Sequence, residues 1–323
     1  MTNRRFFVTS ALAGLALPRM LLAQAAPGKV PRPDIAFRVP NPDPRVAGLV
    51  AQVSQDRLRA DVNALAGFGT RWAEGPGYGA VEDWMAARLA EAGPGQVISR
   101  QPVALPMGST RHNVLWGDAM SGREVILVGA HLDSTSENPG HAAPGANDNG
   151  SGIAAMLEAL RILSGQGFTR SIVAVAFTGE EQNLLGSTAC ARYASHAGWP
   201  IELMVNLDML GYRPPDPAAP LYIEYDRGNA TPVNDVAAAA YGRMAVRLAG
   251  EHTGLAIAET DIWDSDYMPF EQQGFPCIGF YDGGASGPPY HTSGDVPELM
   301  DFDRLEQATR LLVATLATAA ELA

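Results

Sequence analysis

Cysteine and basic residues are both scarce in this sequence. The 323 residues include two cysteines, Cys190 and Cys277, at no metal-binding spacing. One disulfide or two separate buried thiols fit the pair equally well. Lysine and arginine number 23 against 35 acidic residues, which gives a net charge of −12. Nucleic acids and anionic membranes are bound through basic surfaces, so the charge balance argues against both as partners. A serine hydrolase is also disfavoured, because Ser151 stands in Gly-Ser-Gly and not in a G-x-S-x-G motif.

The apolar stretch near the N-terminus, residues 8–22, is too short to span a bilayer stably and is interrupted by Pro18. It follows Arg4-Arg5 and precedes Ala23-Gln24-Ala25, a small-x-small cleavage site. Twin arginines before such a stretch resemble a twin-arginine export signal. We therefore predict an export signal over residues 1–25 and a periplasmic or secreted mature protein without stable membrane insertion. The alternative is the basic start of a cytosolic protein.

The composition of the full sequence, with 46% apolar and 18% charged residues, is typical of a soluble globular protein. Residues 26–44 are predicted to be a Pro-rich lead-in, and residues 45–323 a single catalytic domain. Apolar patterning predicts strands at 97–105, 112–116, 125–128, 171–177, 201–207, 221–225, near 255–258 and at 276–281. It predicts helices at 45–66, 79–92, 153–163, 184–197, 233–249 and 301–322, the last with Asp301 as its N-cap. Strands alternating with helices indicate an α/β fold with three layers, α/β/α, around a mixed, mostly parallel central sheet.

Several predicted strands end in a side chain that can bind a metal. The strand at 125–128 leads to His131 and Asp133, and Asp148 precedes the next helix. The strands at 171–177 and 201–207 lead to Glu180-Glu181 and to Asp208, and a late loop carries His291. Each has a structural explanation when taken alone, such as a solvated turn or a helix cap. Open α/β sheets bind ligands at the carboxyl ends of their strands, and zinc accepts mixed nitrogen and oxygen ligands. Together, the residues therefore predict a zinc site at one edge of the sheet.

Five motifs in order, HLDS, GANDNGSG, FTGEEQNLLGS, NLDMLGY and YHTSGD, resemble the co-catalytic di-zinc exopeptidase family. This family includes bacterial secreted leucyl aminopeptidases and glutamate carboxypeptidases. The resemblance covers roughly residues 110–323. It implies two zinc ions per chain, held by His131, Asp148, Glu181, Asp208 and His291. Asp148 would bridge the ions, with His131 and Asp208 on one and Glu181 and His291 on the other.

The resemblance also implies catalytic roles. Glu180 would be the general base that takes a proton from the attacking water and passes it to the leaving amine. Asp133 would orient the imidazole of His131, as carboxylates commonly do for zinc-bound histidines. The substrate would be a peptide or an aminoacyl compound, and the activity most similar is that of an aminopeptidase.

The sequence departs from the family near the expected substrate site. Ser265-Asp266-Tyr267 has a tyrosine where the family carries a histidine, and the loop before His291 lacks the tyrosine that some aminopeptidases use. Tyr281 or Tyr290 would take the latter role. Asp266, Tyr267, Tyr281 and Tyr290 are thus the candidates for substrate binding.

Three other functions fit the same fold. A glutaminyl cyclase works with one zinc ion, whereas a carboxypeptidase or amidohydrolase shares the metal site and differs only in its pocket. A binding module without catalysis should have lost ligands or the base, and this chain has Glu180 and every ligand position. The preferred substrate residue, the metal used in the cell and the oligomeric state are left open by the sequence.

Overall fold

The computed structural model describes residue 40, residues 43–287 and residues 289–323. The predicted export signal and nearly all of the predicted lead-in lie outside these residues. No helix in the described part of the chain is both long enough and apolar enough to cross a membrane.

One sheet of eight strands runs through the molecule in the order β1-β2-β4-β3-β5-β8-β6-β7. Its four central strands, β4, β3, β5 and β8, are parallel neighbours, whereas β1–β2, β2–β4 and β8–β6 pair antiparallel. The mixed, mostly parallel α/β sheet expected from the sequence is confirmed. The strands are Ile98–Ala104 (β1), Thr110–Trp116 (β2), Val125–His131 (β3), Ser171–Phe177 (β4), Ile201–Asp208 (β5), Leu221–Tyr225 (β6), Ile257–Thr260 (β7) and Cys277–Tyr281 (β8).

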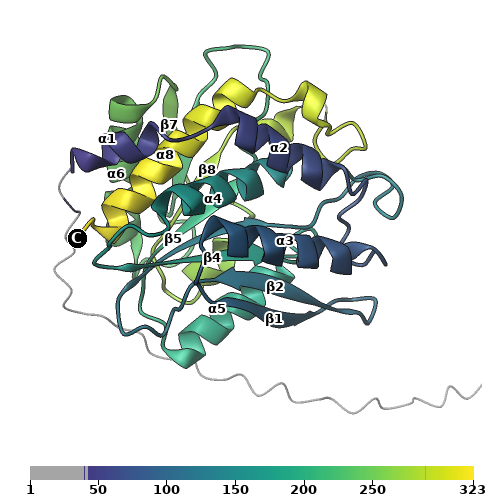
Figure 1. Cartoon of the computed structure of the whole chain (residues 1–323), viewed down its shortest axis with the longest axis horizontal. Helices are drawn as coiled ribbons and strands as arrows, with labels where there is room; N and C mark the ends of the chain where they lie inside the picture. Colours follow the sequence, from purple (N-terminus) through teal and green to yellow (C-terminus); the bar gives the residue numbers. More distant parts are fainter. Residues whose placement is uncertain (1–39, 41–42, 288) are drawn as a thin grey trace, which may run out of the picture.

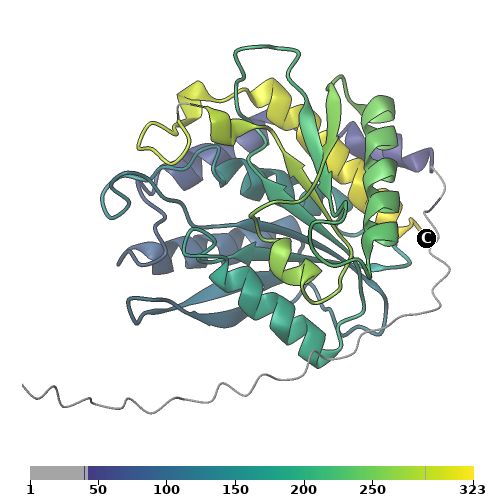
Figure 2. The same ribbon diagram turned by 180° about the vertical axis from the view of Figure 1, so that it is seen from behind.

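Helices cover both faces of the sheet. Figure 1 looks onto the face over which α2, α3, α4 and α8 lie, and Figure 2 shows α5 on the opposite face. Two apolar clusters fill the layers between helices and sheet, because successive strand residues such as Ile126 and Leu127 project to opposite faces. The helices are Arg45–Val50 (α1), Gln55–Ala66 (α2), Tyr78–Ala92 (α3), Gly150–Leu163 (α4), Leu185–Ala197 (α5), Asp235–His252 (α6), Met268–Glu271 (α7) and Phe302–Ala320 (α8), with 3₁₀ turns at Gly284–Ser286 and Pro297–Leu299.

The helix ends follow from capping residues. The side chain of Asp301 accepts the backbone N–H of Arg304 and caps α8, as the sequence predicts. Asn149 caps α4 in the same way by accepting the N–H of Gly152. Both cysteines are free and buried, so the pair forms two separate thiols and no disulfide.

The carboxyl ends of the four parallel strands meet at one edge of the sheet. β3 ends at His131 and β5 at Asp208, while the loops after β4 and β8 carry Glu180-Glu181 and His291. Parallel strands present their carboxyl ends at the same edge, so the topology gathers all these side chains at one place. The fold thus brings together residues that are as far apart in sequence as His131 and His291.

Candidate active site

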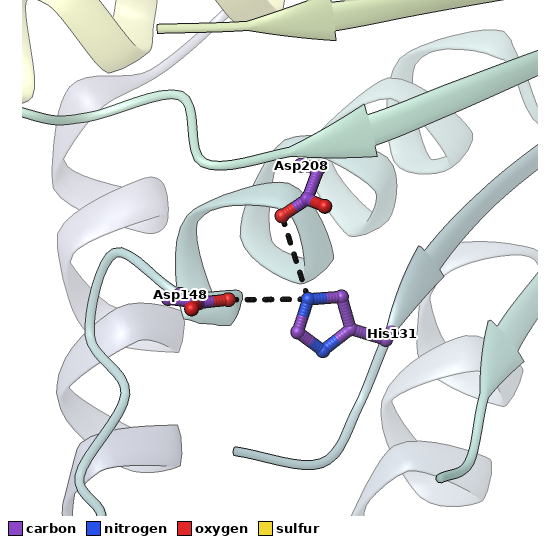
Figure 3. A group of neighbouring side chains, drawn as sticks. All are labelled: His131, Asp148 and Asp208. Atoms are coloured by element: carbon purple, nitrogen blue, oxygen red, sulfur yellow. Dashed lines mark ion pairs between the residues drawn. The ribbon is translucent and has the colours of Figure 1, made fainter. Parts of the chain in front are cut away.

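His131 lies between two carboxylates at the end of β3. Its Nε2 atom is 3.1 Å from Oδ1 of Asp148 and 3.4 Å from Oδ1 of Asp208. Figure 3 shows the three side chains converging from the ends of β3 and β5 and from the segment just before α4. All three are largely buried, and one ligand atom from each lies within 4.8 Å of the others. The group has the size and the donor atoms of one half of a metal site.

A second group shares Asp148. Nε2 of His291 lies 3.3 Å from Oδ2 of Asp148 and 3.2 Å from Oε2 of Glu181. The two oxygens of Asp148 therefore face different histidines, Oδ1 towards His131 and Oδ2 towards His291. A carboxylate with one oxygen in each of two ligand groups has the arrangement needed to bridge two ions.

The chemistry of these atoms fits a metal centre. Oε1 of Glu181 is a buried acceptor that receives no hydrogen bond within the described part of the chain, and Oδ1 of Asp208 has only the long 3.4 Å approach of His131. Buried oxygens without a partner are costly, and a cation would satisfy them. Two imidazole nitrogens with carboxylate oxygens form a donor set that zinc accepts. The residues present therefore fit zinc.

The charge state of the histidines depends on these carboxylates. Burial lowers the pKa of His291, but its hydrogen bonds to Asp148 and Glu181 outweigh this and raise the pKa to about 10. The pKa of His131 is also raised well above its usual value, because the charge of Glu180 and the bonds to Asp148 outweigh burial. A raised pKa favours the protonated ring, and a metal ion that binds a histidine displaces that proton.

The backbone of Asp133, and not its carboxylate, holds the ring of His131. Nδ1 of His131 lies 3.1 Å from the carbonyl oxygen of Asp133 and 4.0 Å from its Oδ1. A carbonyl oxygen only accepts, so Nδ1 carries the hydrogen and Nε2 faces Asp148 and Asp208. The buried carboxylate instead accepts the backbone N–H groups of Gly179, Glu180 and Glu181 at 2.9, 3.2 and 3.3 Å. This differs from the expected role, because the turn after β4 supplies three donors closer than the ring.

Glu180 stands beside both groups without pairing with a histidine. The ion pairs of His131 and His291 run to Asp148, Asp208, Glu181 and Asp133, and none of them involves Glu180. One of its carboxylate oxygens still lies within 4.8 Å of ligand atoms of His131 and Glu181. Burial raises the pKa of Glu180 well above its usual value, and the nearby carboxylates Asp266 and Asp208 add to the effect. A raised pKa suits a group that must both take and return a proton.

Two side chains that the sequence analysis did not single out hold the segment that carries Asp148. The carboxylate of Asp295 accepts the backbone N–H groups of Asn147 at 3.0 Å and of Asp148 at 2.9 Å. The fully buried guanidinium of Arg71 donates to the carbonyls of Leu132 and Gly145, each at 2.9 Å, and to that of Pro144. Asp295 lies four residues after His291 in the YHTSGD motif, which was a usable signal. No motif marked Arg71.

A cavity of about 460 Å³ opens over the two groups. Three of the four candidate substrate-binding residues line it, namely Tyr267, Tyr281 and Tyr290. The ring of Tyr290 stacks on His291 with the centroids 3.7 Å apart. Asp266 is fully buried behind the cavity wall and does not line it. The cavity is also lined by Glu224, a buried acid on β6 that the sequence analysis did not single out.

Comparison with known proteins identifies the family of this chain. The model of "Peptidase family M28" matches residues 114–316. The chain belongs to peptidase family M28. A "Probable zinc metalloprotease" of Pyrenophora teres f. teres is 31% identical over 196 residues, which cover 53% of this chain and 42% of that protein. A "Probable leucine aminopeptidase" of Arthroderma otae is 26% identical, over 83% of this chain and 73% of its own length. The family and these relatives identify the chain as a zinc metallopeptidase.

Solved structures of this fold include several peptidases. LapA aminopeptidase of Legionella pneumophila superposes with a TM-score of 0.74 at 19% identity, over 91% of this chain and 79% of its own. The glutaminyl cyclase of Porphyromonas gingivalis superposes with a TM-score of 0.65 at 24% identity, over 82% of this chain and 98% of its own. These likenesses confirm the fold and do not decide between hydrolysis and cyclisation.

Proposed function

We propose that this M28 peptidase is a di-zinc aminopeptidase that acts outside the cytoplasm. The observation that carries the two-metal assignment is the position of Asp148, whose two oxygens face His131 and His291 respectively. Asp208 would complete the first ligand set and Glu181 the second. When bound, the pair of ions lowers the pKa of the attacking water and polarises the scissile carbonyl.

The chain's own residues would supply the proton transfers. Glu180 lies at the cavity and is held by its backbone N–H on Asp133. Its carboxylate would accept a proton as the water oxygen bonds to the carbonyl carbon, and would return that proton to the amine as the C–N bond breaks. A positioned acid–base group of this kind typically contributes about 10²–10⁴-fold to the rate.

The charge of the cavity favours an aminopeptidase over a carboxypeptidase. A carboxypeptidase must bind a free carboxylate, for which arginine or lysine is the usual partner. Among the described residues that line the cavity there is no lysine or arginine. A free substrate carboxylate would therefore have no basic partner in the lining, so the chain end that enters the cavity is taken to be the free amino group.

Cyclisation of N-terminal glutamine is the second candidate, because a glutaminyl cyclase shares this fold. A cyclase of that kind works with one zinc ion. Both ligand groups are complete in this chain, with His131 and Asp208 present as well as Glu181 and His291. The complete pair of groups favours the two-metal peptidase.

The site of action is proposed from the sequence. Arg4-Arg5, the apolar stretch at 8–22 and the cleavage motif at Ala23-Gln24-Ala25 support export through the twin-arginine route. Replacing both arginines by lysine should leave the uncleaved precursor in the cytoplasm, as detected by fractionation. Normal export and cleavage of that variant would contradict the proposal.

The decisive experiment combines metal analysis with hydrolysis of aminoacyl-4-nitroanilides by the mature protein. We expect about two zinc ions per chain, chelator-sensitive release of the N-terminal residue, and no activity on N-acetylated substrates. Glu180→Gln should lower kcat by about 10²–10⁴-fold while the zinc content is kept. Glu298→Gln, the same change on an exposed turn, is the control that should leave both unchanged. One zinc ion with cyclisation of glutaminyl substrates would favour the cyclase, and no turnover of any substrate would refute the enzyme.

A further inference from the structure

Glu224 lies on the same face of the sheet as the metal-binding edge. On β8, Tyr281 is the direct partner of Asp208 in β5, and Gly279 is the direct partner of Glu224 in β6. Directly opposed residues, and residues two apart on one strand, project to the same face. Glu224 therefore faces the same side as Asp208, two strand spacings or roughly 10 Å across the sheet. A long side chain extending from a substrate at the metal groups spans such a distance.

Gly279 leaves the space in which the carboxyl group of Glu224 sits. A Cβ atom at Gly279 would lie 2.7 Å from the ring of Tyr267 and 2.8 Å from Oε2 of Glu224. The hydroxyl of Tyr267 donates to Oε2 of Glu224 at 2.9 Å and accepts the backbone N–H of Trp263, also at 2.9 Å. The carboxyl group is thus fixed through one oxygen. Oε1 has no hydrogen-bond partner within the described part of the chain, which leaves it for a ligand in the cavity.

The surroundings of Glu224 suit a cation with an apolar stem. Trp263 and Tyr281 line the same cavity with rings that are not buried, and aromatic faces bind guanidinium and ammonium groups as well as methylene chains. Asp264 adds a second carboxylate at the exposed side. Burial raises the pKa of Glu224 to about 8, and a cation placed beside it would favour the ionised form.

We propose that Glu224 is a specificity-determining residue that selects lysine or arginine as the substrate residue whose side chain enters this cavity. The inference rests on the proposed aminopeptidase function and names its substrate class. Tyr267 is a positioning residue in this arrangement, because it holds the carboxyl group that would pair with the substrate. Tyr267, which stands where the family carries a histidine, would thus position the carboxyl group of Glu224.

The test compares a charged substrate side chain with an uncharged one of similar length. The zinc-loaded protein is assayed with the 4-nitroanilides of lysine, arginine, norleucine and leucine. We expect kcat/KM for lysine to exceed that for norleucine by about 10-fold or more. Glu224→Gln, which keeps an acceptor for Tyr267, should remove most of this preference. It should leave kcat/KM for the norleucine substrate within about 3-fold of its original value. Tyr267→Phe should reduce the preference partly.

The matched control is Glu259→Gln on the adjacent strand β7, an exposed acid that does not line the cavity. It should leave the ratio of lysine to norleucine unchanged. Hydrolysis of norleucine and leucine substrates without a preference for basic residues, or a preference that survives Glu224→Gln, would overturn the inference and leave the aminopeptidase intact.

A binding measurement separates this inference from failure of the proposed function. If no aminoacyl substrate is hydrolysed, calorimetry with lysinamide and norleucinamide still reports on the cavity. Tighter binding of lysinamide, weakened about 10-fold or more by Glu224→Gln, would support a basic-residue site. Equal affinity of the two amides would overturn it.

Discussion

The carboxylate of Asp133 holds the backbone of Glu180, with Oδ1 3.2 Å from its N–H group. The same carboxylate accepts the N–H groups of Gly179 and Glu181, so three consecutive residues donate hydrogen bonds to one buried acid. One of them carries the proposed base and another a proposed metal ligand. Asp133 therefore acts on the site through the turn after β4, while its carbonyl oxygen aligns His131.

The exchange Asp133→Asn tests this relationship. An amide keeps only one acceptor oxygen, so its NH2 group would face either the N–H of Glu181 or the N–H groups of Gly179 and Glu180 and would push that part of the turn away. The backbone carbonyl of residue 133 would still align His131. We expect kcat/KM to fall by about 10–100-fold, as is usual when a supporting partner of a metal site is removed. Asp118→Asn is the matched control, because Asp118 is exposed and, among the described residues, bonds only to the N–H of Met120. Unchanged activity in Asp133→Asn would show that the turn does not need the carboxylate.

Zinc binding at pH 7 should release protons. His291 has a pKa raised to about 10 in the metal-free protein, so its ring must lose a proton before it can bind a metal. The affinity for zinc should therefore rise with pH, by about tenfold per pH unit for each proton released. Calorimetry in buffers of different ionisation enthalpy measures the number of protons. The His291→Gln variant should release fewer protons on zinc binding. The variant His141→Gln, at an exposed histidine, should release as many as the original protein. Binding without proton release would contradict the charge state assigned to the ring.

Apolar patterning located most elements because strand and helix periods are local properties. β3 is three residues longer than predicted, since Gly129 and Ala130 look like a strand end yet pair with Val175 and Ala176 of β4. Gly129 is required there because a Cβ atom would lie 2.3 Å from the ring of Phe177. The place of β8 between β5 and β6 was not predictable, because strand order depends on long-range packing.

The site residues within motifs were predictable, and those that support them were less so. His131 and Asp208 end apolar strands, and such a pattern can be recognised in one sequence. Arg71 contacts the loop that carries Asp148 through hydrogen bonds to backbone carbonyl groups distant in sequence. Such contacts do not depend on the residues next to Arg71, so no local sequence pattern indicates them. Glu224 did leave a signal, namely an acid inside the apolar strand LYIEY, but only the register with Gly279 shows what it faces.

Arg71 should be essential for the loop that carries Asp148. Its buried guanidinium donates to the carbonyls of Leu132, Pro144 and Gly145. Arg71→Met would leave the first two acceptors without a partner, whereas the carbonyl of Gly145 still accepts the N–H of Gly150. Each unsatisfied buried acceptor costs about 1–3 kcal/mol, so we expect the free energy of unfolding to fall by at least about 2 kcal/mol. Urea unfolding measures this loss.

The control for Arg71 is an arginine on the outside of the same region. Arg59 is exposed and lies over the ring of Phe302, 3.8 Å from its centroid. Arg59→Met should cost less than about 1 kcal/mol. Arg71→Lys keeps the charge but lacks the planar guanidinium group, so its loss of unfolding free energy should lie between those of Arg71→Met and Arg59→Met. An Arg71→Met variant as stable as Arg59→Met would show that water replaces the lost donors.

Glu158 should make folding sensitive to acid at a place far from the metal groups. Burial raises the pKa of Glu158, but hydrogen bonds from Arg161, Arg57 and the N–H of Ser54 lower it more, to below its usual 4.5. A carboxylate whose pKa is lower in the folded state adds stability above pH 4.5 and loses it as the pH falls through the folded-state value. Glu158→Gln should therefore destabilise the protein at pH 7 by about 1–3 kcal/mol, between exposed and buried ion pairs.

The difference between original and variant should shrink as the pH is lowered from 7 towards 3, because protonation removes the same charge that the exchange removes. Glu306→Gln provides the control, since Glu306 pairs with Arg310 within α8, where its Oε1 lies 2.6 Å from Nη2. Such an i,i+4 pair contributes about 0.2–0.5 kcal/mol, so its loss should be small at every pH. Urea unfolding of the three proteins at several pH values gives the comparison. A Glu158→Gln difference that stays constant down to pH 3 would mean that the carboxylate stabilises α2 and α4 through packing and not through its charge.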